Sequence, residues 1–232
     1  MSEIQLGIYP LYYRDVTNPS ILMQKIYPDM RKNYYWSEDF SPEFYIAQAK
    51  AGFIAVTDLF EGKELLLPEI QFSYAVLHFE DIHINRKVKR IIQKHTPKLN
   101  ITTDFIPIAE KIRSYHKQCW LTPKYIDILK QTQDLNDDFQ MIAAYIEENG
   151  SVISGEIGYI IGDTYTSLSG FSSREKNYRN YGTLQLVLLA KYLKENSFAF
   201  WNLGQSYMPY KFQLGAKQYT RNDFLQLWFK HT

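Results

Sequence analysis

The chain has 232 residues, enough to bury a substantial core in one large domain or in one domain with a small appendage. Its 45% hydrophobic and 22% charged residues are typical of a globular protein, and a net charge of +1 excludes a global attraction to nucleic acid. The single cysteine, Cys119, excludes an internal disulfide and a cysteine-rich metal site. The five histidines show no recognised ligand spacing, so we expect no metal.

We expect neither a targeting segment nor a membrane segment. The first residues, MSEIQLGIYPLYYRDV, lack the basic and apolar stretches of a signal peptide. No apolar run approaches the about 20 residues that a membrane helix needs. Together with the single cysteine, these features predict a cytoplasmic protein that does not bind membranes.

Residues 1–75 are expected to form a small N-terminal α/β domain. Within it, residues 1–33 predict short extended pieces and turns. A short helix is predicted over 41–53, which opens on a Ser-Pro-Glu start signal and ends at a glycine. Residues 60–79 predict strands around a Glu-Gly-Lys turn.

A cationic helix is predicted from Asn85 to Lys94, ending before Pro97. No acidic residue lies between Asp81 and Asp104. At helical spacing the cations gather on one face and the apolar residues on another, so the helix can pack on a core and hold a row of phosphates. A solvated basic face without a partner is the alternative. The residues that we expect to contact nucleic-acid phosphates are Arg86, Lys87, Arg90 and Lys94.

From residue 76 the pattern predicts a larger domain, 76–232. Its predicted elements are helices at 103–116 (capped by Thr103) and 121–135, three strands within 139–171, a helix at 182–195, and strands at 197–205 and 225–229. This order predicts an α+β fold whose mixed, largely antiparallel sheet is flanked by helices. It is the element order of the GCN5-related N-acetyltransferase (GNAT) fold.

The GNAT signature that binds the pyrophosphate of acetyl-CoA is only partly present. Its consensus is Gln/Arg-x-x-Gly-x-Gly/Ala at the start of a helix. Arg179 and Gly182 fit this pattern, but Leu184 stands where a small residue should let the pyrophosphate approach. A GNAT acetyltransferase therefore stays open as an alternative function.

Two further residues have a structural and a functional interpretation. Trp120, just before a helix start, is either a core residue or a wall of a binding pocket. Glu156 has the apolar neighbours Ile153, Ile157 and Ile160. It is either an outward-facing strand carboxylate or a charge in a pocket that recognises a cation or polarises an amine.

Six segments, in order, resemble the bacterial leucyl/phenylalanyl-tRNA–protein transferases over about residues 33 to 227. They include DFSPEFYIAQAKAGF, similar to the family's D-L-S-P-E-x-L-x-x-A-Y-x-x-G-I-F, and DIHINRKVKR, similar to D-L-H-I-S-R-S-x-K-R. The others are ITTDF, CWLTPKYI, the hairpin from NGSVISGEIGYI to SLSGFSS, and FQLGAKQYTRNDFL. The tail is also similar to the arginyl-tRNA–protein transferases, which share the fold.

The resemblance implies an enzyme that moves an amino acid from aminoacyl-tRNA to the N-terminal amine of a protein, which marks that protein for degradation. It implies a GNAT-like catalytic domain behind the small N-terminal domain, with no cofactor. The partners would be aminoacyl-tRNA and the acceptor's N-terminus, with the basic helix on the tRNA phosphates. We expect a monomer.

The resemblance also assigns site residues and shows departures. Gln205 and Asn202 would orient the ester carbonyl and the incoming amine, although the family has aspartate at or next to Asn202. Leu168 replaces a family glutamate. The loss of these two carboxylates leaves a non-catalytic tRNA- or peptide-binding module open. The expected substrate-binding residues are Trp120, Glu156, Ser169 and Phe171. Because Glu156 replaces a methionine of an apolar pocket, we expect it to favour a cationic amino acid.

Overall fold

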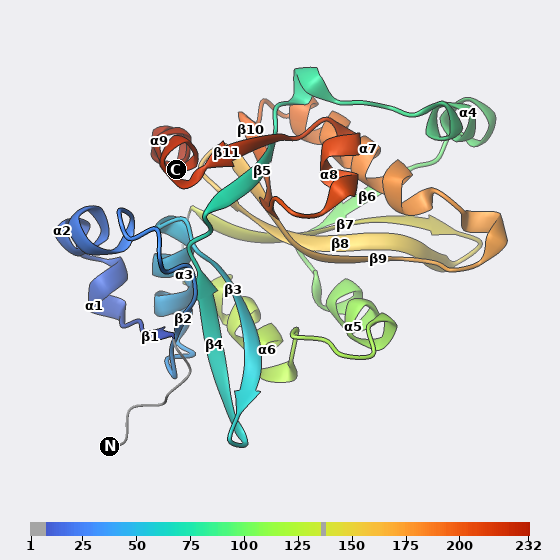
Figure 1. The fold of residues 1–232 in the computed structure, drawn as a ribbon. Coiled ribbons are helices and arrows are strands. Elements are labelled where there is room, and N and C mark those ends of the chain that lie inside the picture. Colours follow the sequence, from blue (N-terminus) through green and yellow to red (C-terminus); the bar gives the residue numbers. More distant parts are fainter. Residues whose placement is uncertain (1–7, 136–137) are drawn as a thin grey trace.

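In the computed structural model, which describes residues 8–135 and 138–232, a seven-stranded sheet forms the centre of the molecule (Figure 1). Its strand order is β11-β5-β10-β9-β8-β7-β6. The strands are β5 (Ser73–Leu77), β6 (Leu99–Thr102), β7 (Phe139–Glu148), β8 (Ser151–Ile161), β9 (Thr164–Ser172), β10 (Phe200–Gln205) and β11 (Lys217–Thr220). All neighbours are antiparallel except β9 and β10, which are parallel. This confirms the predicted GNAT-like α+β fold with a mixed, largely antiparallel sheet.

The long hairpins of this sheet follow from their turn residues. Asn149 and Gly150, between β7 and β8, both have positive φ (53° and 73°), as the favoured two-residue hairpin turn requires. Gly162, between β8 and β9, has φ 56° and lies so close to the His231 carbonyl that a Cβ atom would be only 2.1 Å from it. Both predicted hairpins are confirmed.

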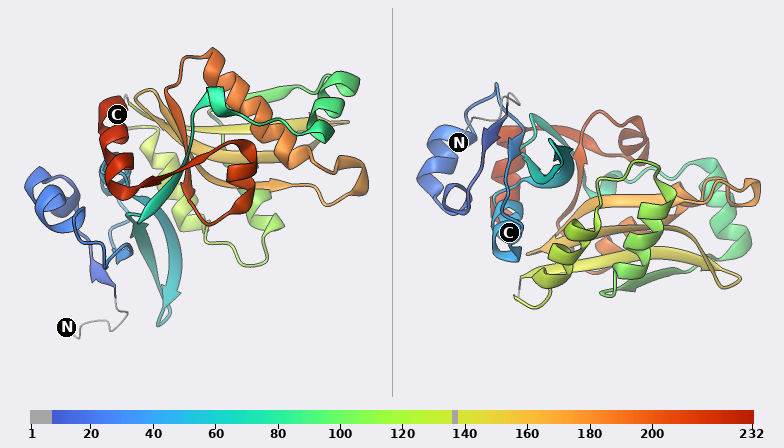
Figure 2. Two further views of the ribbon diagram at one scale, coloured as in Figure 1. Left: turned by 45° about the horizontal axis from the view of Figure 1, so that its top comes forward. Right: turned by 90° about the horizontal axis from the view of Figure 1, so that it is seen from below.

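Helices cover both faces of the sheet (Figures 1 and 2). One face packs against α4 (Arg86–His95), α7 (Tyr181–Glu195) and α8 (Pro209–Leu214). The other packs against α3 (Pro42–Lys50), α5 (Ile106–Tyr115), α6 (Pro123–Thr132) and α9 (Arg221–His231). Each face has its own apolar core, as alternation along the strands predicts. Single 3-10 turns lie at Phe79–Asp81 and Lys176–Tyr178.

The N-terminal part differs from the prediction of extended pieces and turns over 1–33. After β1 (Tyr9–Pro10) come α1 (Tyr13–Val16), α2 (Pro19–Ile21) and a π-helical turn (Leu22–Ile26). Asn18 starts the second helix because its side-chain oxygen accepts hydrogen bonds from two backbone N–H groups. Residues 1–7 of that prediction lie outside the described residues. The segment continues with β2 (Tyr35–Trp36) and the hairpin β3 (Ile54–Phe60) and β4 (Lys63–Glu69).

Two other predictions need correction. Residues 225–229, predicted as a strand, lie in α9, where Thr220 caps the helix start and donates to Asp223 at 2.7 Å. The buried residues Phe224, Leu225 and Trp228 have helical spacing. The alternation of apolar and polar residues in LQLWF had favoured a strand instead. The predicted helix 103–116 begins only at Ile106, without a side-chain cap from Thr103, and β6 was not predicted. Helices α3, α4, α6 and α7 are confirmed.

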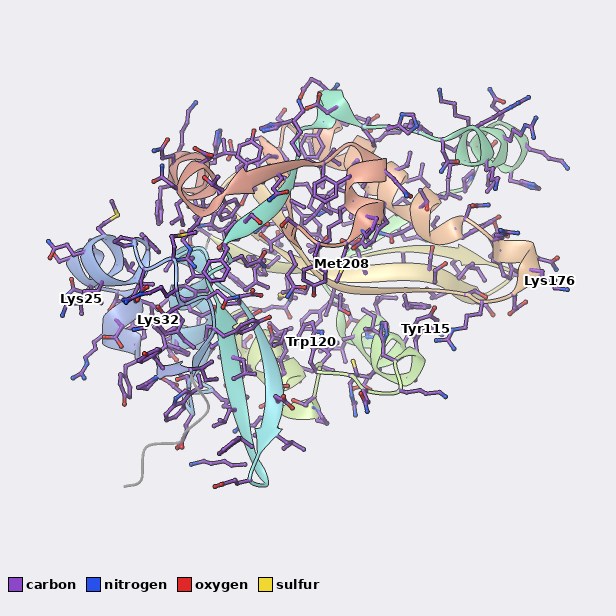
Figure 3. All side chains as sticks on the ribbon, viewed as in Figure 1. Lys25, Lys32, Tyr115, Trp120, Lys176 and Met208 are labelled. Carbon is purple, nitrogen blue, oxygen red and sulfur yellow. The ribbon has the colours of Figure 1, made fainter. Side chains whose placement is uncertain are left out.

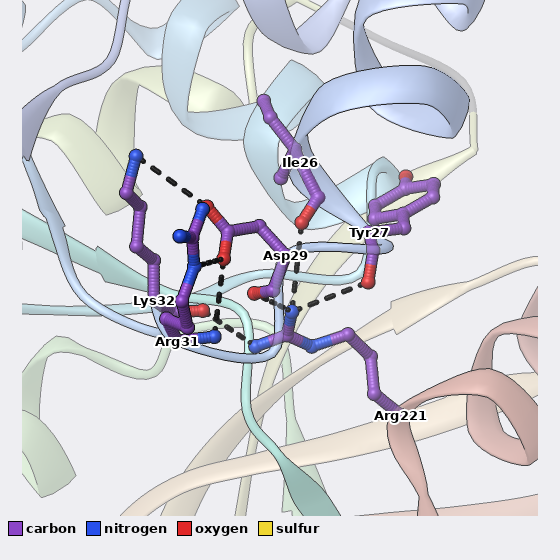
Figure 4. A network of polar contacts seen from close by, with 6 residues as sticks. All are labelled: Ile26, Tyr27, Asp29, Arg31, Lys32 and Arg221. Carbon is purple, nitrogen blue, oxygen red and sulfur yellow. Dashed lines mark hydrogen bonds and ion pairs between the residues drawn. The ribbon is translucent and has the colours of Figure 1, made fainter.

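The predicted division between 1–75 and 76–232 falls inside β5 in the structure. One apolar core contains both Leu11 and Trp228, so the N-terminal elements and the last helix share buried contacts. Arg221 also joins them, since its guanidinium donates to backbone carbonyls of the N-terminal segment (Figure 4). Where the domain boundary lies stays a prediction.

Candidate active site

A cavity of about 710 Å³ opens beside the β3–β4 hairpin, where elements from both faces of the main sheet meet. Its walls come from β3, β4, β8, β9, the first turn of α7, the end of β10, α8 and the α5–α6 connection. Figure 3 labels three lining residues: Met208 lies across from Tyr115 and Trp120. Residues far apart in the sequence therefore meet in one hollow.

Five of the six residues predicted for catalysis and substrate binding line this cavity. They are Trp120, Glu156, Ser169, Phe171 and Gln205. Leu168, where the resemblance places a glutamate, lines it too. Trp120 is held from two sides: Thr57 of β3 donates a hydrogen bond to its carbonyl, and its ring packs edge-on to Tyr125 at 5.1 Å. The hairpin therefore positions this wall.

Asn202, the sixth residue, is buried beside the cavity and does not line it. Its side-chain oxygen accepts from the Gly204 N–H at 2.9 Å, and its side-chain nitrogen donates to Thr166 Oγ1 at 3.3 Å. These bonds hold an irregularity in β10, where Gly204 has φ +73° and the register to β5 shifts. Asn202 thus shapes the backbone that presents Gln205.

Gln205 is bonded through its side chain and its backbone. The side-chain nitrogen donates to Glu69 Oε2 at 3.1 Å and to the Tyr34 hydroxyl at 3.3 Å. The side-chain oxygen accepts from the Tyr207 hydroxyl, and the backbone carbonyl accepts from Lys211 Nζ at 2.7 Å. These contacts fix the carboxamide at the cavity wall.

The structure places Glu156 in the cavity, at 4% exposure, rather than on an outward face. Its Oε1 accepts from the Tyr165 hydroxyl at 2.9 Å and from Ser167 Oγ at 2.8 Å. Burial raises the pKa of Glu156 to about 7, against the opposing effect of its hydrogen bonds and of the Lys211 charge. Burial also lowers the pKa of Lys211 to about 8, against the charges of Glu156 and Glu69. The cavity thus holds two carboxyl groups and an amine, and two of these three groups have a perturbed pKa.

Sequence reasoning did not identify Glu69, Lys211, Gln71 and Gln185, which also line the cavity. Glu69 and Lys211 are buried charged residues, which are rare unless they have partners. The Gln71 Oε1 and Gln185 Nε2 atoms are buried without a hydrogen-bond partner. The available sequence signal for Glu69 and for Lys211 was one charged residue within a mostly apolar segment, LLLPEI for the first and YKFQL for the second.

The basic helix α4 lies at the opposite end of the molecule from α1 and α2 (Figures 1 and 2). Its four predicted phosphate contacts are exposed, while Val88 is buried. A second cleft, of about 480 Å³, separates α4 from the start of α7. Lys87, Arg90 and Arg179 line it together. The structure therefore adds a cation from another segment to the predicted basic face.

Among the described residues, no group of three or more His, Cys, Asp or Glu side chains is placed to hold a metal ion. None of the helices in the described ranges is long and apolar enough to span a membrane.

The family model described as leucyl/phenylalanyl-tRNA protein transferase matches residues 76–228, more than half of the chain. The chain belongs to this family. The resemblance seen in its motifs is thereby confirmed, and the leucyl/phenylalanyl-tRNA protein transferase family is one of aminoacyl-tRNA-dependent transferases. The match covers β8, β9, α7, β10 and α8, which line most of the cavity, and also α4. It does not extend over Glu69 and Gln71.

No curated protein matches this member of the family. Remote solved structures include FemX (9% identity, 97% of this chain and 84% of FemX covered, TM-score 0.46). Another is the C-terminal domain (DUF2156) of a candidate lysylphosphatidylglycerol synthetase from Agrobacterium fabrum, with 10% identity, 80% of this chain covered and a TM-score of 0.46. Our chain spans only 65% of that structure. A GCN5-related N-acetyltransferase from Kribbella flavida is 11% identical, with 90% and 73% covered and a TM-score of 0.39.

Proposed function

We propose that this protein transfers an amino acid from aminoacyl-tRNA to the N-terminal amine of an acceptor protein and so marks it for degradation. One observation carries the proposal: Trp120, Glu156, Ser169, Phe171 and Gln205, chosen from family motifs and local pattern, meet in one cavity. The family itself supports an aminoacyl-tRNA-dependent transfer. We further propose that the protein is cytoplasmic and monomeric.

The reaction needs positioning more than covalent catalysis. The amine nitrogen of the acceptor attacks the ester carbonyl carbon, a C–N bond forms, and the bond from that carbon to the terminal ribose oxygen breaks. A proton leaves the amine, and the ribose oxygen takes one up. Gln205 would orient the incoming amine and the carbonyl, with its carboxamide held by Glu69, Tyr34 and Tyr207. Asn202 would act through the backbone around Gly204.

The tRNA would approach along α4. A row of exposed cations supplies affinity that does not depend on nucleotide sequence. Arg86, Lys87, Arg90 and Lys94 are exposed on this helix, and Arg179 faces the adjoining cleft. The start of α7 borders both hollows, because Tyr181 lines the cleft and Gly182 and Thr183 line the cavity, so a bound acceptor end could extend from one to the other.

Glu156 would read the side chain of the transferred amino acid. A cationic side chain such as that of arginine or lysine could pair with its carboxylate, whereas an apolar side chain would bury the carboxylate without a partner. Lys211 shares the cavity and moderates this preference, because it already balances part of the negative charge.

The experiment is incubation with a mixture of charged tRNAs and N-terminally distinct peptides, scored by peptide mass. We expect one peptide class to gain the mass of one amino-acid residue, and Gln205→Ala to abolish the gain. Acetylated peptide, or saturable heat with acetyl-CoA, would favour an acetyltransferase instead; Leu184, buried at the start of α7, argues against that coenzyme. Binding of tRNA without any transfer would favour a binding module.

A further inference from the structure

Glu69 is the last residue of β4, where the hairpin meets the main sheet, and its side chain lines the cavity at 8% exposure. One carboxylate oxygen accepts from Asn33 Nδ2 at 2.9 Å and the other from Gln205 Nε2 at 3.1 Å. Both donors are neutral amides. Within 8–135 and 138–232, no cationic group lies within salt-bridge distance of Glu69, and the charges of Lys211 and Arg221 act on it only from farther away. Since buried carboxylates are normally paired, this one suits a cation that arrives with a substrate.

Gln71 supplies a second, independent observation in the same wall. Its side chain is 3% exposed and lines the cavity, and its Oε1 has no hydrogen-bond partner. A buried acceptor without a donor costs stability unless a ligand satisfies it. A carboxylate and an amide oxygen from one short segment match a primary ammonium, which has several N–H donors and no acceptor.

We propose that Glu69 and Gln71 bind the α-ammonium of the acceptor's first residue, so that the N-terminal part of the chain supplies the acceptor subsite. The inference rests on the proposed transfer function. It assigns Glu69 as a substrate-binding residue that also positions Gln205 through their hydrogen bond.

Aminoacyl-tRNA also carries a primary ammonium, but its place in the cavity is different. Glu156, which would hold the transferred side chain, lies on β8. Glu69 lies just before β5, and β10 and β9 separate β5 from β8. Three strand spacings, about 14 Å, separate β5 from β8, so Glu69 and Glu156 reach the cavity from different walls. Gln205, from β10, lies on the Glu69 side, where the bound ammonium would attack as an amine after it has given up a proton.

The test compares Glu69→Gln with Glu61→Gln, a matched change at the exposed turn of the same hairpin. The glutamine keeps the size of the side chain and an acceptor for one of the two donors, Asn33 or Gln205. Transfer rates are measured against peptide and against aminoacyl-tRNA separately. We expect the KM for peptide to rise about tenfold or more in Glu69→Gln, as the loss of a hydrogen-bonded charge implies, with the KM for aminoacyl-tRNA nearly unchanged. Glu61→Gln should match the wild type.

Calorimetry without tRNA supplies a readout that a merely structural role would not change. The probes are heptapeptides of one sequence with a free or an acetylated N-terminus. We expect the wild type to bind the peptide with the free amine more tightly. Glu69→Gln and Gln71→Leu should each lose most of that preference. Both variants should keep the thermal unfolding midpoint of the wild type to within a few degrees.

The outcomes separate the two proposals. An unchanged free-amine preference in Glu69→Gln, or a wild type that binds neither peptide, would overturn the acceptor subsite. A rise in the KM for aminoacyl-tRNA alone would overturn it too, because the ammonium would then be the donor's. A Glu69-dependent preference without transfer from any charged tRNA would support the subsite and defeat the transfer function.

Discussion

The guanidinium of Arg221 donates a hydrogen bond to the backbone carbonyl of Lys32 at 2.7 Å, which joins the start of the last helix to a segment 189 residues earlier (Figure 4). The same side chain donates to the carbonyls of Ile70 and Gln71 in the β4–β5 connection. It is 1% exposed. One buried cation therefore connects three segments that together support the Glu69 end of the cavity.

Replacing Arg221 with alanine should lower the free energy of unfolding by about 3–5 kcal/mol, because several buried carbonyls lose their donor at once. Arg221→Lys should recover only part of this, since the ammonium has fewer donors in a different geometry. Urea unfolding measures both. The exposed Arg86→Ala is the control and should stay within about 0.5 kcal/mol of the wild type. An unchanged urea midpoint in Arg221→Ala would show that these carbonyls find other partners.

The basic face of α4 should bind tRNA phosphates. Changing Arg86, Arg90 and Lys94 together to alanine should weaken tRNA binding and flatten its dependence on salt, because fewer counterions are released. The slope of log K against log[salt] should fall by about one for each phosphate that the variant no longer neutralises. Filter binding or fluorescence anisotropy over a salt series measures this.

The matched control removes three exposed lysines from the opposite face of the sheet and the loop beside it: Lys111, Lys117 and Lys130. This variant has the same change in net charge, so a general electrostatic effect would weaken both proteins equally. Equal affinity and equal slope in the α4 variant and the wild type would rule the α4 interface out.

Local signals account for the elements that could be predicted. Ser41 and Thr122 each accept a hydrogen bond from a backbone N–H three residues on, so α3 and α6 begin where their sequences indicate. The prediction for the end of the chain was wrong because LQLWF alternates like a strand. Its buried residues instead have the spacing of a helix, which packs on β5 and α3. Tertiary packing decided this element rather than local pattern.

The candidate site was predictable only where motifs carry it. Gln205 and Trp120 were found from their motifs, and Glu156 from an apolar surrounding. Glu69 and Lys211 became visible only when the chain folded, because each bonds to Gln205 from a different element, Glu69 across 136 residues and Lys211 across 6. Glu69 and Gln205 lie so far apart in the sequence that no local residue spacing predicts their hydrogen bond.

Glu156 should make stability depend on pH in a defined direction. Its pKa in the folded protein is raised to about 7, above its ordinary value of 4.5, so between these values the folded state binds more protons than the unfolded state. The free energy of unfolding should therefore fall as pH rises through this window, by a few kcal/mol. Glu156→Gln should remove this decline, and Glu147→Gln, an exposed change on β7, should keep it. Urea unfolding from about pH 4.5 to 7.5 measures the difference; parallel curves for wild type and Glu156→Gln would contradict the assignment.

Glu156 should also set the amino-acid preference of the transfer. An apolar side chain in such a pocket gains about 1.5–3 kcal/mol from burial, and a carboxylate beside it removes much of that gain. A guanidinium or ammonium instead forms a charge-assisted pair with the carboxylate, so the preference reverses. Glu156→Met should therefore shift transfer from basic toward leucine-like amino acids.

The measurement is transfer from arginyl-, lysyl- and leucyl-tRNA to one common peptide, for the wild type, Glu156→Met and the exposed control Glu147→Met. The ratio of kcat/KM for arginine over leucine should fall by about tenfold or more in Glu156→Met and stay constant in the control. Efficient leucine transfer by the wild type, or the same ranking in Glu156→Met, would show that the carboxylate does not contact the transferred side chain. The Tyr165 and Ser167 hydroxyls, which both donate to Glu156, would then account for its burial as part of the core alone.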